Sequence, residues 1–259
     1  MADFIKMQGT GNDFVIVDIT KSETPLEKAK IRFSSEDLSQ LAIKICQRRM
    51  SIGADGLVIL SSGPQKNQLE WKFFNSDGSH AEMCGNAARC VALYAISHLN
   101  LGPLVEIHTT AGVIRGQRGA HDHPKITMTP VTGFKEKQVI HLGDQSVEFD
   151  YLNTGVPHAL HSRNFEVSEN FRQQFSLLRN HSNFQPQEPT SQIVKVIDDY
   201  HVRSASFERG VESFTLACGT GAVAAAFLHL NRIDKAYGTV RYLFPVAIAM
   251  LKLVKKVFI

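Results

Sequence analysis

The sequence predicts a mixed α/β protein made of two similar halves, residues 1–129 and 130–259. Short runs rich in β-branched and aromatic residues alternate with longer runs of helical periodicity. One motif occurs twice: a cysteine, a glycine and a small polar residue precede an alanine-rich apolar run at Cys84 and again at Cys218. A Thr-Gly turn ends 73 residues before Cys84 and another ends 63 residues before Cys218. This repetition indicates an internal duplication.

Composition restricts the class of protein. The 259 residues are 43% hydrophobic and 20% charged, which is typical of globular proteins and leaves room for two domains. The net charge of +3 comes with dispersed Lys and Arg, so no nucleic-acid partner is expected. There is no apolar run of the roughly 18 residues that a membrane span needs, and no signal-peptide pattern. Four cysteines without a Cys-x-x-Cys pair fit a reducing cytosol. We expect a soluble cytoplasmic protein with no membrane partner.

In the first half, a helix is expected over 34–49, because Ser34 and Asp37 form a capping-box pattern before an apolar periodicity. Cys46 and Cys90 fall inside helices and are interpreted as core residues. A Gly-rich hairpin turn is expected between the first two strands. The expected strands are 4–7, 14–19, 57–60, 69–74, 104–109, 113–118 and 125–128.

In the second half, a helix is expected within 165–178 and a polar loop over 180–192. The expected strands are 139–142, 147–152, 193–197, 201–207 and 239–244. The tail after Arg232 is atypical. Its apolar segment 245–259 is expected to pack on the core, with a membrane-surface helix as the alternative. His121 and His123 lack further ligands nearby, so no metal site is expected.

Both repeated cysteines are expected where a helix begins. A thiol there lies at the positive end of the helix dipole, beside free backbone N–H groups, which favours the thiolate relative to a reference pKa of about 8.5. The same N–H groups suit a substrate carboxylate. Two cysteines in matching settings therefore predict two groups that face one small substrate.

Two thiols on opposite faces of a substrate suit the inversion of configuration at the α-carbon of a carbon acid. A thiolate removes the α-proton from one face and a thiol returns a proton to the other face. Backbone N–H groups of Gly85, Asn86, Gly219 and Thr220 can stabilise charge on the carboxylate, and no cofactor is required. The competing interpretation is a hydrolase or acyltransferase with a single nucleophilic cysteine and His158 as its base. It leaves the second cysteine unexplained.

The combined motifs resemble the diaminopimelate epimerase family, whose members interconvert LL- and meso-diaminopimelate without a cofactor. The resemblance covers most of the chain up to about residue 232. It is carried by the following segments: Lys6-Met-x-Gly-x-Gly-Asn-Asp-Phe14, Phe74-Asn-x-Asp-Gly-Ser79, Cys84-Gly-Asn86, Phe207-Glu-Arg-Gly210 and Ala217-Cys-Gly-Thr-Gly221.

This resemblance implies two pseudo-twofold related domains, each a mostly antiparallel sheet rolled around a central helix, with the active site in the interdomain cleft. It implies Cys84 and Cys218 as the acid and base, with His158 and Glu208 near the reacting centre. It also implies a homodimer and a role in lysine and peptidoglycan precursor biosynthesis. The implied substrate-binding residues are Asn12, Asn75, Gly85, Asn86, Glu208, Arg209, Gly219 and Thr220. Arg209 can bind a carboxylate bidentately and Glu208 can accept from an ammonium group.

The chain departs from the family in three places. Val156 and Thr190, the latter expected in the loop before a strand, stand where the family usually has asparagines that bind the far end of the substrate. The family's closing hairpin is not recognisable after Arg232. We therefore expect relaxed specificity, with glutamate as a possible second substrate. The related proline racemases usually carry histidine where this chain has Asn86, and so match less well. From another class of protein, a non-catalytic amino-acid-binding protein is a remote alternative.

Overall fold

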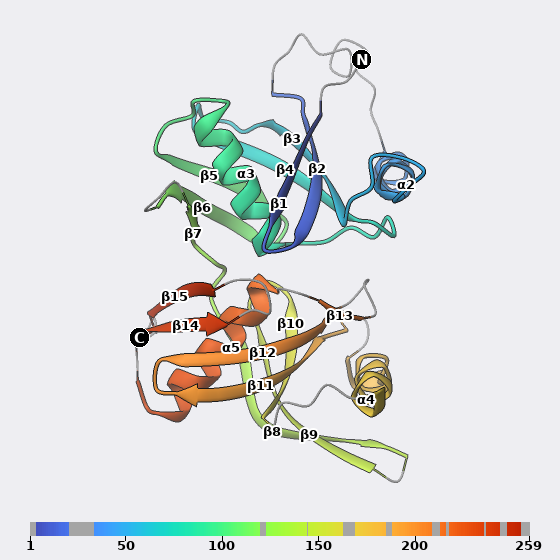
Figure 1. Ribbon diagram of the computed structural model, residues 1–259, viewed down its shortest axis with the longest axis vertical. Helices are drawn as coiled ribbons and strands as arrows, with labels where there is room; N and C mark the ends of the chain where they lie inside the picture. The colour runs from blue at the N-terminus through green and yellow to red at the C-terminus, as the bar shows by residue number, and fades with distance from the viewer. Residues whose placement is uncertain are drawn as a thin grey trace. The chain divides into compact units, whose positions relative to one another are not determined.

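The computed structural model describes ten segments of the chain. These are residues 4–20, 34–119, 123–143, 145–162, 169–184, 188–208, 213–215, 218–235, 237–243 and 248–254. They form two compact units, Met1–Thr129 and Pro130–Ile259, each with one sheet and two α-helices among its described residues (Figure 1).

The first unit holds a seven-stranded sheet whose strands lie side by side in chain order. They are β1 (Phe4–Gly9), β2 (Asn12–Asp18), β3 (Gly56–Ser62), β4 (Gln68–Asn75), β5 (Leu104–Thr109), β6 (Gly112–Arg118) and β7 (Pro124–Ile126). The β2–β3 and β4–β5 pairs are parallel and the others are antiparallel. Each parallel pair needs a crossover, and the crossovers carry α2 (Ser35–Cys46) and α3 (Gly85–Ser97).

Helix α3 is the centre of this unit. It packs against β1 and β2 at one edge of the sheet and against β5, β6 and β7 at the other, so the sheet curls around it (Figure 1). Alternate residues of β2 separate the two faces, since Phe14 and Ile16 join the core around α3 while Val15 and Val17 join the core under α2. Gly116 permits close contact, because a Cβ there would lie 2.5 Å from the Cβ of Ala92 in α3.

The second unit holds an eight-stranded sheet in the order β15-β14-β12-β11-β10-β9-β8, with β13 paired to β12. Its strands are β8 (Thr132–Leu142), β9 (Gln145–Asn153), β10 (Pro157–Ser162), β11 (Thr190–Asp198), β12 (His201–Glu208), β13 (Ser213–Thr215), β14 (Tyr237–Leu243) and β15 (Ile248–Val254). Parallel pairs join β10 to β11 and β12 to β14. Their crossovers carry α4 (Glu169–Arg179), a 3-10 turn (Ser182–Phe184) and α5 (Gly219–Arg232).

The two sheets repeat one pattern. From β1 to β6 the pairings run antiparallel, parallel, antiparallel, parallel, antiparallel, and the series β9, β10, β11, β12, β14, β15 runs the same way. Helices α3 and α5 occupy the second parallel crossover of each series. The predicted fold class, two related α/β halves that each curl around a helix, is therefore confirmed.

Several local predictions are confirmed. Ser34 caps α2, with both hydrogen bonds of the capping box to Asp37 in place. Thr10 and Gly11, both at positive φ, form the two-residue turn of the β1–β2 hairpin. Cys46 and Cys90 are buried in the core. Burial, helped by Asp55 and Asp13, raises the pKa of Cys46 to about 11, and burial next to Cys84 raises that of Cys90 to about 12.

Other expectations were wrong. Helix α2 ends at Cys46, three residues before the expected end. Thr190 is the first residue of β11 rather than part of a loop, because it pairs in register with His158 of β10. The tail over 248–254 is a strand, so the alternative of a surface helix fails there. The closing hairpin is present as β14–β15, which packs against α5. Residues 244–247 and 255–259 lie outside the described residues.

Candidate active site

Each unit places one cysteine at the N-cap of its central helix. Cys84 precedes Gly85 at the start of α3, and Cys218 precedes Gly219 at the start of α5. Both cysteines have extended backbones, with φ and ψ of −141° and 116° at Cys84 and −122° and 109° at Cys218. The first backbone N–H groups of a helix have no intrahelical acceptor and carry the positive end of its dipole. Each unit thus presents a thiol beside an anion-binding helix terminus.

The two thiols differ in their contacts. The sulfur of Cys218 is buried and accepts the backbone N–H of Gly221 at 3.4 Å, and the Thr220 hydroxyl lies 3.5 Å from it. Cys84 is half-buried, and its side chain makes no capping hydrogen bond to α3. The helix-start geometry is therefore shared, whereas the immediate surroundings of the sulfur are not.

The predicted binding residues Asn12 and Asn86 are hydrogen-bonded to each other in the first unit. The Asn86 amide donates from Nδ2 to Oδ1 of Asn12 at 2.6 Å, and Nδ2 of Asn12 donates to Oδ2 of Asp55 at 3.0 Å. On its other side, Oδ1 of Asn86 accepts from Nη2 of Arg89 at 2.6 Å and from the hydroxyl of Thr10 at 3.0 Å. The structure thus gathers two predicted residues with three that the sequence analysis did not single out.

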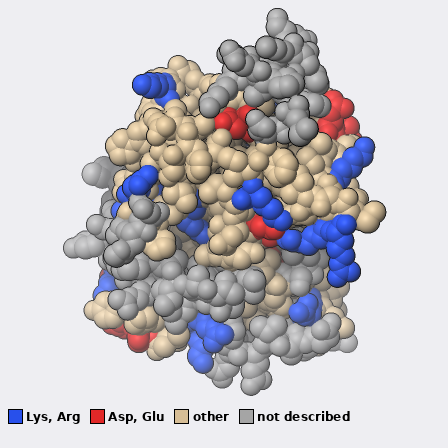
Figure 2. Space-filling model, turned by 45° about the horizontal axis from the view of Figure 1, so that its top comes forward, with Lys and Arg blue, Asp and Glu red and all other residues tan. Residues whose placement is uncertain are grey.

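Ion pairs surround one end of this group. Asp13 binds Arg48 and Lys6, with nitrogen–oxygen distances of 2.6 and 3.1 Å, and Arg48 also binds Asp55 at 2.8 Å. Partial burial alone would raise the pKa of Asp13, but the hydrogen bonds from Arg48 and Lys6 outweigh it and lower that pKa to about 2. Elsewhere, on the face in Figure 2, the described Lys and Arg side chains are scattered and form no continuous basic stripe.

The second unit gathers uncharged polar groups near Cys218. The Thr154 hydroxyl donates to the carbonyl of Thr220 at 3.0 Å, and the Gln192 amide donates to the hydroxyl of Ser206 at 2.7 Å. Gln192 lies against the start of α5, since a Cβ on Gly221 would overlap its amide nitrogen. None of Thr154, Gln192 and Ser206 was singled out as a site residue from the sequence.

His158 is fully removed from solvent. It is 0% exposed, and neither ring nitrogen has a hydrogen-bond partner among the described residues. Burial lowers its pKa from 6.5 to about 3, so the imidazole is neutral at physiological pH. It pairs with Leu152 of β9, which belongs to the core around α5, so the ladder directs it toward the same face of the sheet.

Asn75 and Glu208 end equivalent strands, β4 and β12. Nδ2 of Asn75 donates to the hydroxyl of Ser79 at 2.9 Å within a tight turn, and Glu208 accepts a short hydrogen bond from Thr215. Arg209 lies outside the described residues.

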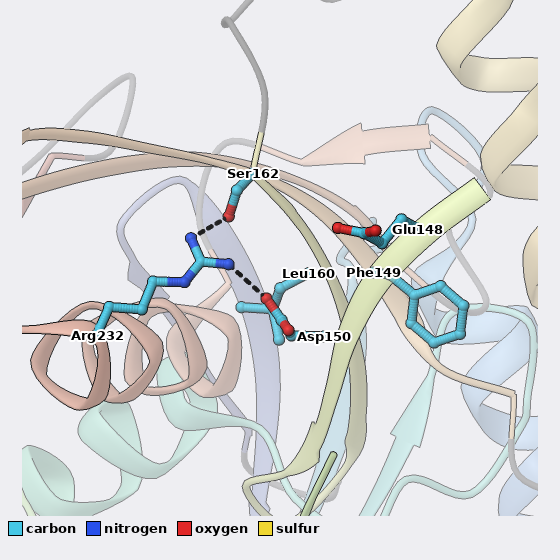
Figure 3. Close-up of a pocket in the computed structure, with 6 residues that line it drawn as sticks. All are labelled: Glu148, Phe149, Asp150, Leu160, Ser162 and Arg232. Carbon is cyan, nitrogen blue, oxygen red and sulfur yellow. Dashed lines mark hydrogen bonds and ion pairs between the residues drawn. The ribbon is translucent and has the colours of Figure 1, made fainter. Parts of the chain in front are cut away.

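A cavity of about 250 Å³ in the second unit is separate from Cys218. It is lined by Glu148, Phe149, Asp150, Leu160, Ser162 and Arg232 (Figure 3). Arg232 bridges the Ser162 hydroxyl at 2.6 Å and the Asp150 carboxylate at 2.7 Å. Arg232 ends α5 while Cys218 begins it, so the helix holds them about 20 Å apart.

Within the described ranges, no three His, Cys, Asp or Glu side chains converge as a metal site, and His121 and Asp122 lie outside those ranges. No described helix is both long and apolar enough to cross a bilayer.

Comparison with known proteins identifies the relatives of this chain. The family model described as diaminopimelate epimerase matches residues 4–133. The diaminopimelate epimerase of Aquifex aeolicus is 36% identical over 230 residues, which cover 87% of this chain and 80% of that protein. The diaminopimelate epimerase of Carboxydothermus hydrogenoformans is 36% identical over 234 residues, covering 86% and 81% of the two chains.

Solved structures show the same fold at lower identity. A hydroxyproline epimerase from Agrobacterium vitis has a TM-score of 0.71 at 15% identity, covering 97% of this chain and 83% of its own. A probable proline racemase from Agrobacterium radiobacter has a TM-score of 0.67 at 14% identity, covering 94% and 82%.

Proposed function

The chain belongs to the diaminopimelate epimerase family, and we propose that it converts LL-diaminopimelate to meso-diaminopimelate by proton transfer at Cys84 and Cys218. It is an isomerase of the amino-acid epimerase class. The single observation that carries the mechanism is the matched position of the two cysteines, each the N-cap of the central helix of its unit.

In the proposed reaction, one cysteine is a thiolate and the other a thiol. The thiolate takes the α-proton, and the electron pair of the broken C–H bond delocalises onto the substrate carboxylate. The thiol then donates its proton to the opposite face of the carbon. The centre is inverted and the two cysteines exchange protonation states, so no redox step or cofactor enters the balance.

Two features support carboxylate binding at the reacting end. The N–H groups of Gly85 and Asn86 in α3, and of Gly219 and Thr220 in α5, belong to the first turns, where a helix favours an anion. Such preorganised donors stabilise charge that develops in the transition state. We propose that Asn12, Asn75, Glu208 and Arg209 bind the amino and carboxylate groups of the substrate.

His158 acts in this proposal as a neutral group. An imidazole with a pKa of about 3 does not store a proton at neutral pH, so it fits orientation of substrate or of Cys218 better than proton storage. The same property disfavours the single-nucleophile alternative, in which a histidine has to accept the thiol proton.

The test is proton NMR of LL-diaminopimelate with reduced enzyme in D2O. We expect the α-proton signal to decrease as meso product forms, and epimerisation to fall at least about 100-fold in both Cys84→Ser and Cys218→Ser. Cys46→Ala is the control, because that buried thiol lies outside the proposed site. Retained epimerisation in either site variant would exclude the two-base mechanism. Amino-acid binding without any α-hydrogen exchange would favour the non-catalytic alternative.

We further propose relaxed specificity toward the far end of the substrate. Val156 and Thr190 cannot supply the two amide side chains that the family usually has there, while the reacting-end residues are present. The double variant Val156→Asn/Thr190→Asn is expected to raise the kcat/KM ratio of diaminopimelate over glutamate by about 10-fold or more, since a matched polar contact discriminates strongly. An unchanged ratio would refute this explanation, as would a wild-type enzyme that exchanges the α-proton of diaminopimelate alone. Proline, assayed beside glutamate, tests the remaining racemase alternative.

The family suggests that the enzyme serves lysine and peptidoglycan precursor biosynthesis. A cytoplasmic location and a homodimeric state are parts of the proposal. Sedimentation equilibrium of the reduced protein measures the second of these directly.

A further inference from the structure

One hydrogen-bonded chain in the first unit has charged groups at both ends. It runs from the Arg89 guanidinium to Oδ1 of Asn86, from Nδ2 of Asn86 to Oδ1 of Asn12, and from Nδ2 of Asn12 to Oδ2 of Asp55. The three donor–acceptor distances are 2.6, 2.6 and 3.0 Å. Its members come from α3, the start of β2 and the residue before β3.

The charged groups at the two ends determine the direction of the hydrogen bonds between them. A guanidinium can only donate and a carboxylate can only accept, whereas an amide side chain has one acceptor and one donor end. If both amides were reversed, Nδ2 of Asn86 would face the Arg89 donors and Oδ1 of Asn12 would face the Asp55 carboxylate. Both contacts would be repulsive and would leave partly buried polar groups unpaired. Only one orientation of both amides therefore satisfies the chain.

The charged ends are themselves held in place. Arg89 also donates to the Gly85 carbonyl at 3.3 Å and to the Thr10 hydroxyl at 2.9 Å, in a turn whose backbone at Thr10 has a φ of 53°. This conformation is uncommon for a β-branched residue and persists only when its surroundings stabilise it. Asp55 accepts from Arg48 at 2.8 Å and from the backbone N–H of Asp13 at 3.1 Å.

We infer that Arg89 and Asp55 are positioning residues of the reaction, which fix the orientation of the Asn86 and Asn12 amides and so hold the Asn12 side chain in place for the substrate. This inference rests on the proposed function, because it takes Asn12 to be a substrate-binding group. A fixed amide presents the same donor or acceptor to every substrate molecule. A freely flipping amide presents the wrong atom part of the time.

Two variants remove the directing property with little change in size. Arg89→Met removes the donors, and Asp55→Asn replaces an acceptor-only group with one that also donates. We expect kcat/KM to fall about 10- to 100-fold in each, as misplaced binding groups typically cause. Arg89→Lys retains a donor-only cation, so it should recover activity to within about fivefold of wild type.

Glu106→Gln is the matched control. Glu106 likewise accepts hydrogen bonds from an amide, Gln68 at 2.9 Å, and from an arginine, Arg115 at 3.0 Å. These bonds connect β5 to β4 and β6, and Glu106 is not part of the series of hydrogen bonds from Arg89 to Asp55. It should leave kcat/KM within about twofold of wild type. Equal losses in Glu106→Gln and Asp55→Asn would overturn the inference, since any hydrogen-bonded carboxylate would then have the same effect. No rescue by Arg89→Lys in a folded protein would also overturn it.

A second measurement does not depend on turnover. The side-chain NH2 resonances of Asn12 and Asn86, assigned with Asn12→Asp and Asn86→Asp, should be protected from solvent exchange in the free enzyme and lose protection at least about 10-fold in Arg89→Met. Unchanged protection refutes the positioning role. Loss of protection in Arg89→Met, together with a wild-type protein that shows no epimerisation, would support the fixed orientation of the two amides and refute the proposed function.

Discussion

The two halves of this protein share a scaffold and differ in the polar and charged side chains around the start of the central helix. Both place a cysteine at the start of the helix in the second parallel crossover. In both, a Thr-Gly turn lies against the residue two positions after that cysteine, which is Asn86 in the first half and Thr220 in the second. Thr10 hydrogen-bonds the Asn86 side chain, whereas Thr154 hydrogen-bonds the Thr220 carbonyl. Near the start of its central helix, the first half has the charged groups Arg89 and Asp55. The described contacts near the start of α5 come from the buried neutral groups Thr154 and Gln192.

This contrast shows which features the duplicated fold requires. Strand order and the helix start recur, because they depend on backbone hydrogen bonds that many side chains permit. The polar contacts around each thiol are not repeated, because they depend on individual side chains. An enzyme that inverts a carbon needs two opposed groups but has no requirement for identical surroundings.

The largest expected difference lies near the starts of the equivalent strands β2 and β10, where Asn12 is hydrogen-bonded and His158 is fully buried without a hydrogen-bond partner among the described residues. Protonation of His158 favours the unfolded chain, in which its pKa is near 6.5, over the folded one, in which it is about 3. The contribution of the neutral His158 imidazole to the free energy of unfolding is complete above pH 6.5. It falls by about 1.4 kcal/mol per pH unit as the pH drops toward 3. His158→Leu should remove this slope in urea unfolding between pH 6.5 and 4.

His141→Gln, at an exposed position, is the control for the loss of a histidine. Measurements stay above pH 4 because Asp13, with its lowered pKa, adds a loss of the same sign below about 3.8. Identical slopes for His158→Leu and wild type would mean that the imidazole is solvated or paired.

A smaller effect separates the two turn threonines. Thr154→Val should reduce the free energy of unfolding by about 0.5–1.5 kcal/mol, because it removes a fully buried hydrogen bond to the Thr220 carbonyl. Thr10→Val should cost less than about 1 kcal/mol, since Arg89 still donates to Asn86. Chemical denaturation of both variants measures the difference, and a larger loss for Thr10→Val would reverse the contrast.

The smallest difference concerns the thiols as helix caps. Cys218→Ala should destabilise by about 1 kcal/mol, because it removes the acceptor of the Gly221 N–H, whereas Cys84→Ala removes no such cap. Cys218→Ser retains an acceptor and should recover most of the loss. Thermal unfolding of the three variants at one pH compares them. Equal costs for the two alanine variants would refute a capping role for Cys218.

The predictions that succeeded rest on signals within a few residues. The capping box at Ser34, the helix starts after Cys84 and Cys218, and the Thr10-Gly11 turn are each readable from a short segment. The repeat was also visible, because the same local pattern occurs twice.

The features that were missed depend on register between distant strands. Phe14 pairs with Gly56, so Asp55 comes to lie beside Asp13 and Asn12, a placement that no local motif encodes. Arg89 lies one helical turn after Asn86, and that spacing alone could have suggested contact. The closing hairpin was missed because an apolar run fits a strand as well as a helix until its pairing partner is known. The expected packing of the tail on the core is confirmed for β15, which contacts α5.

The second sheet is completed by β14 and β15, which follow α5 in the chain and pack against it. During synthesis, the first half can fold while the second is still being made, an interval of about 7–26 s for 130 residues at ribosomal rates. The helix that begins at Cys218 gains its contacts with β15 only when residues 248–254 have left the ribosome. The two thiols that we propose as acid and base are therefore assembled at different times, and loss of the final strands would expose the interior of the half that is completed last.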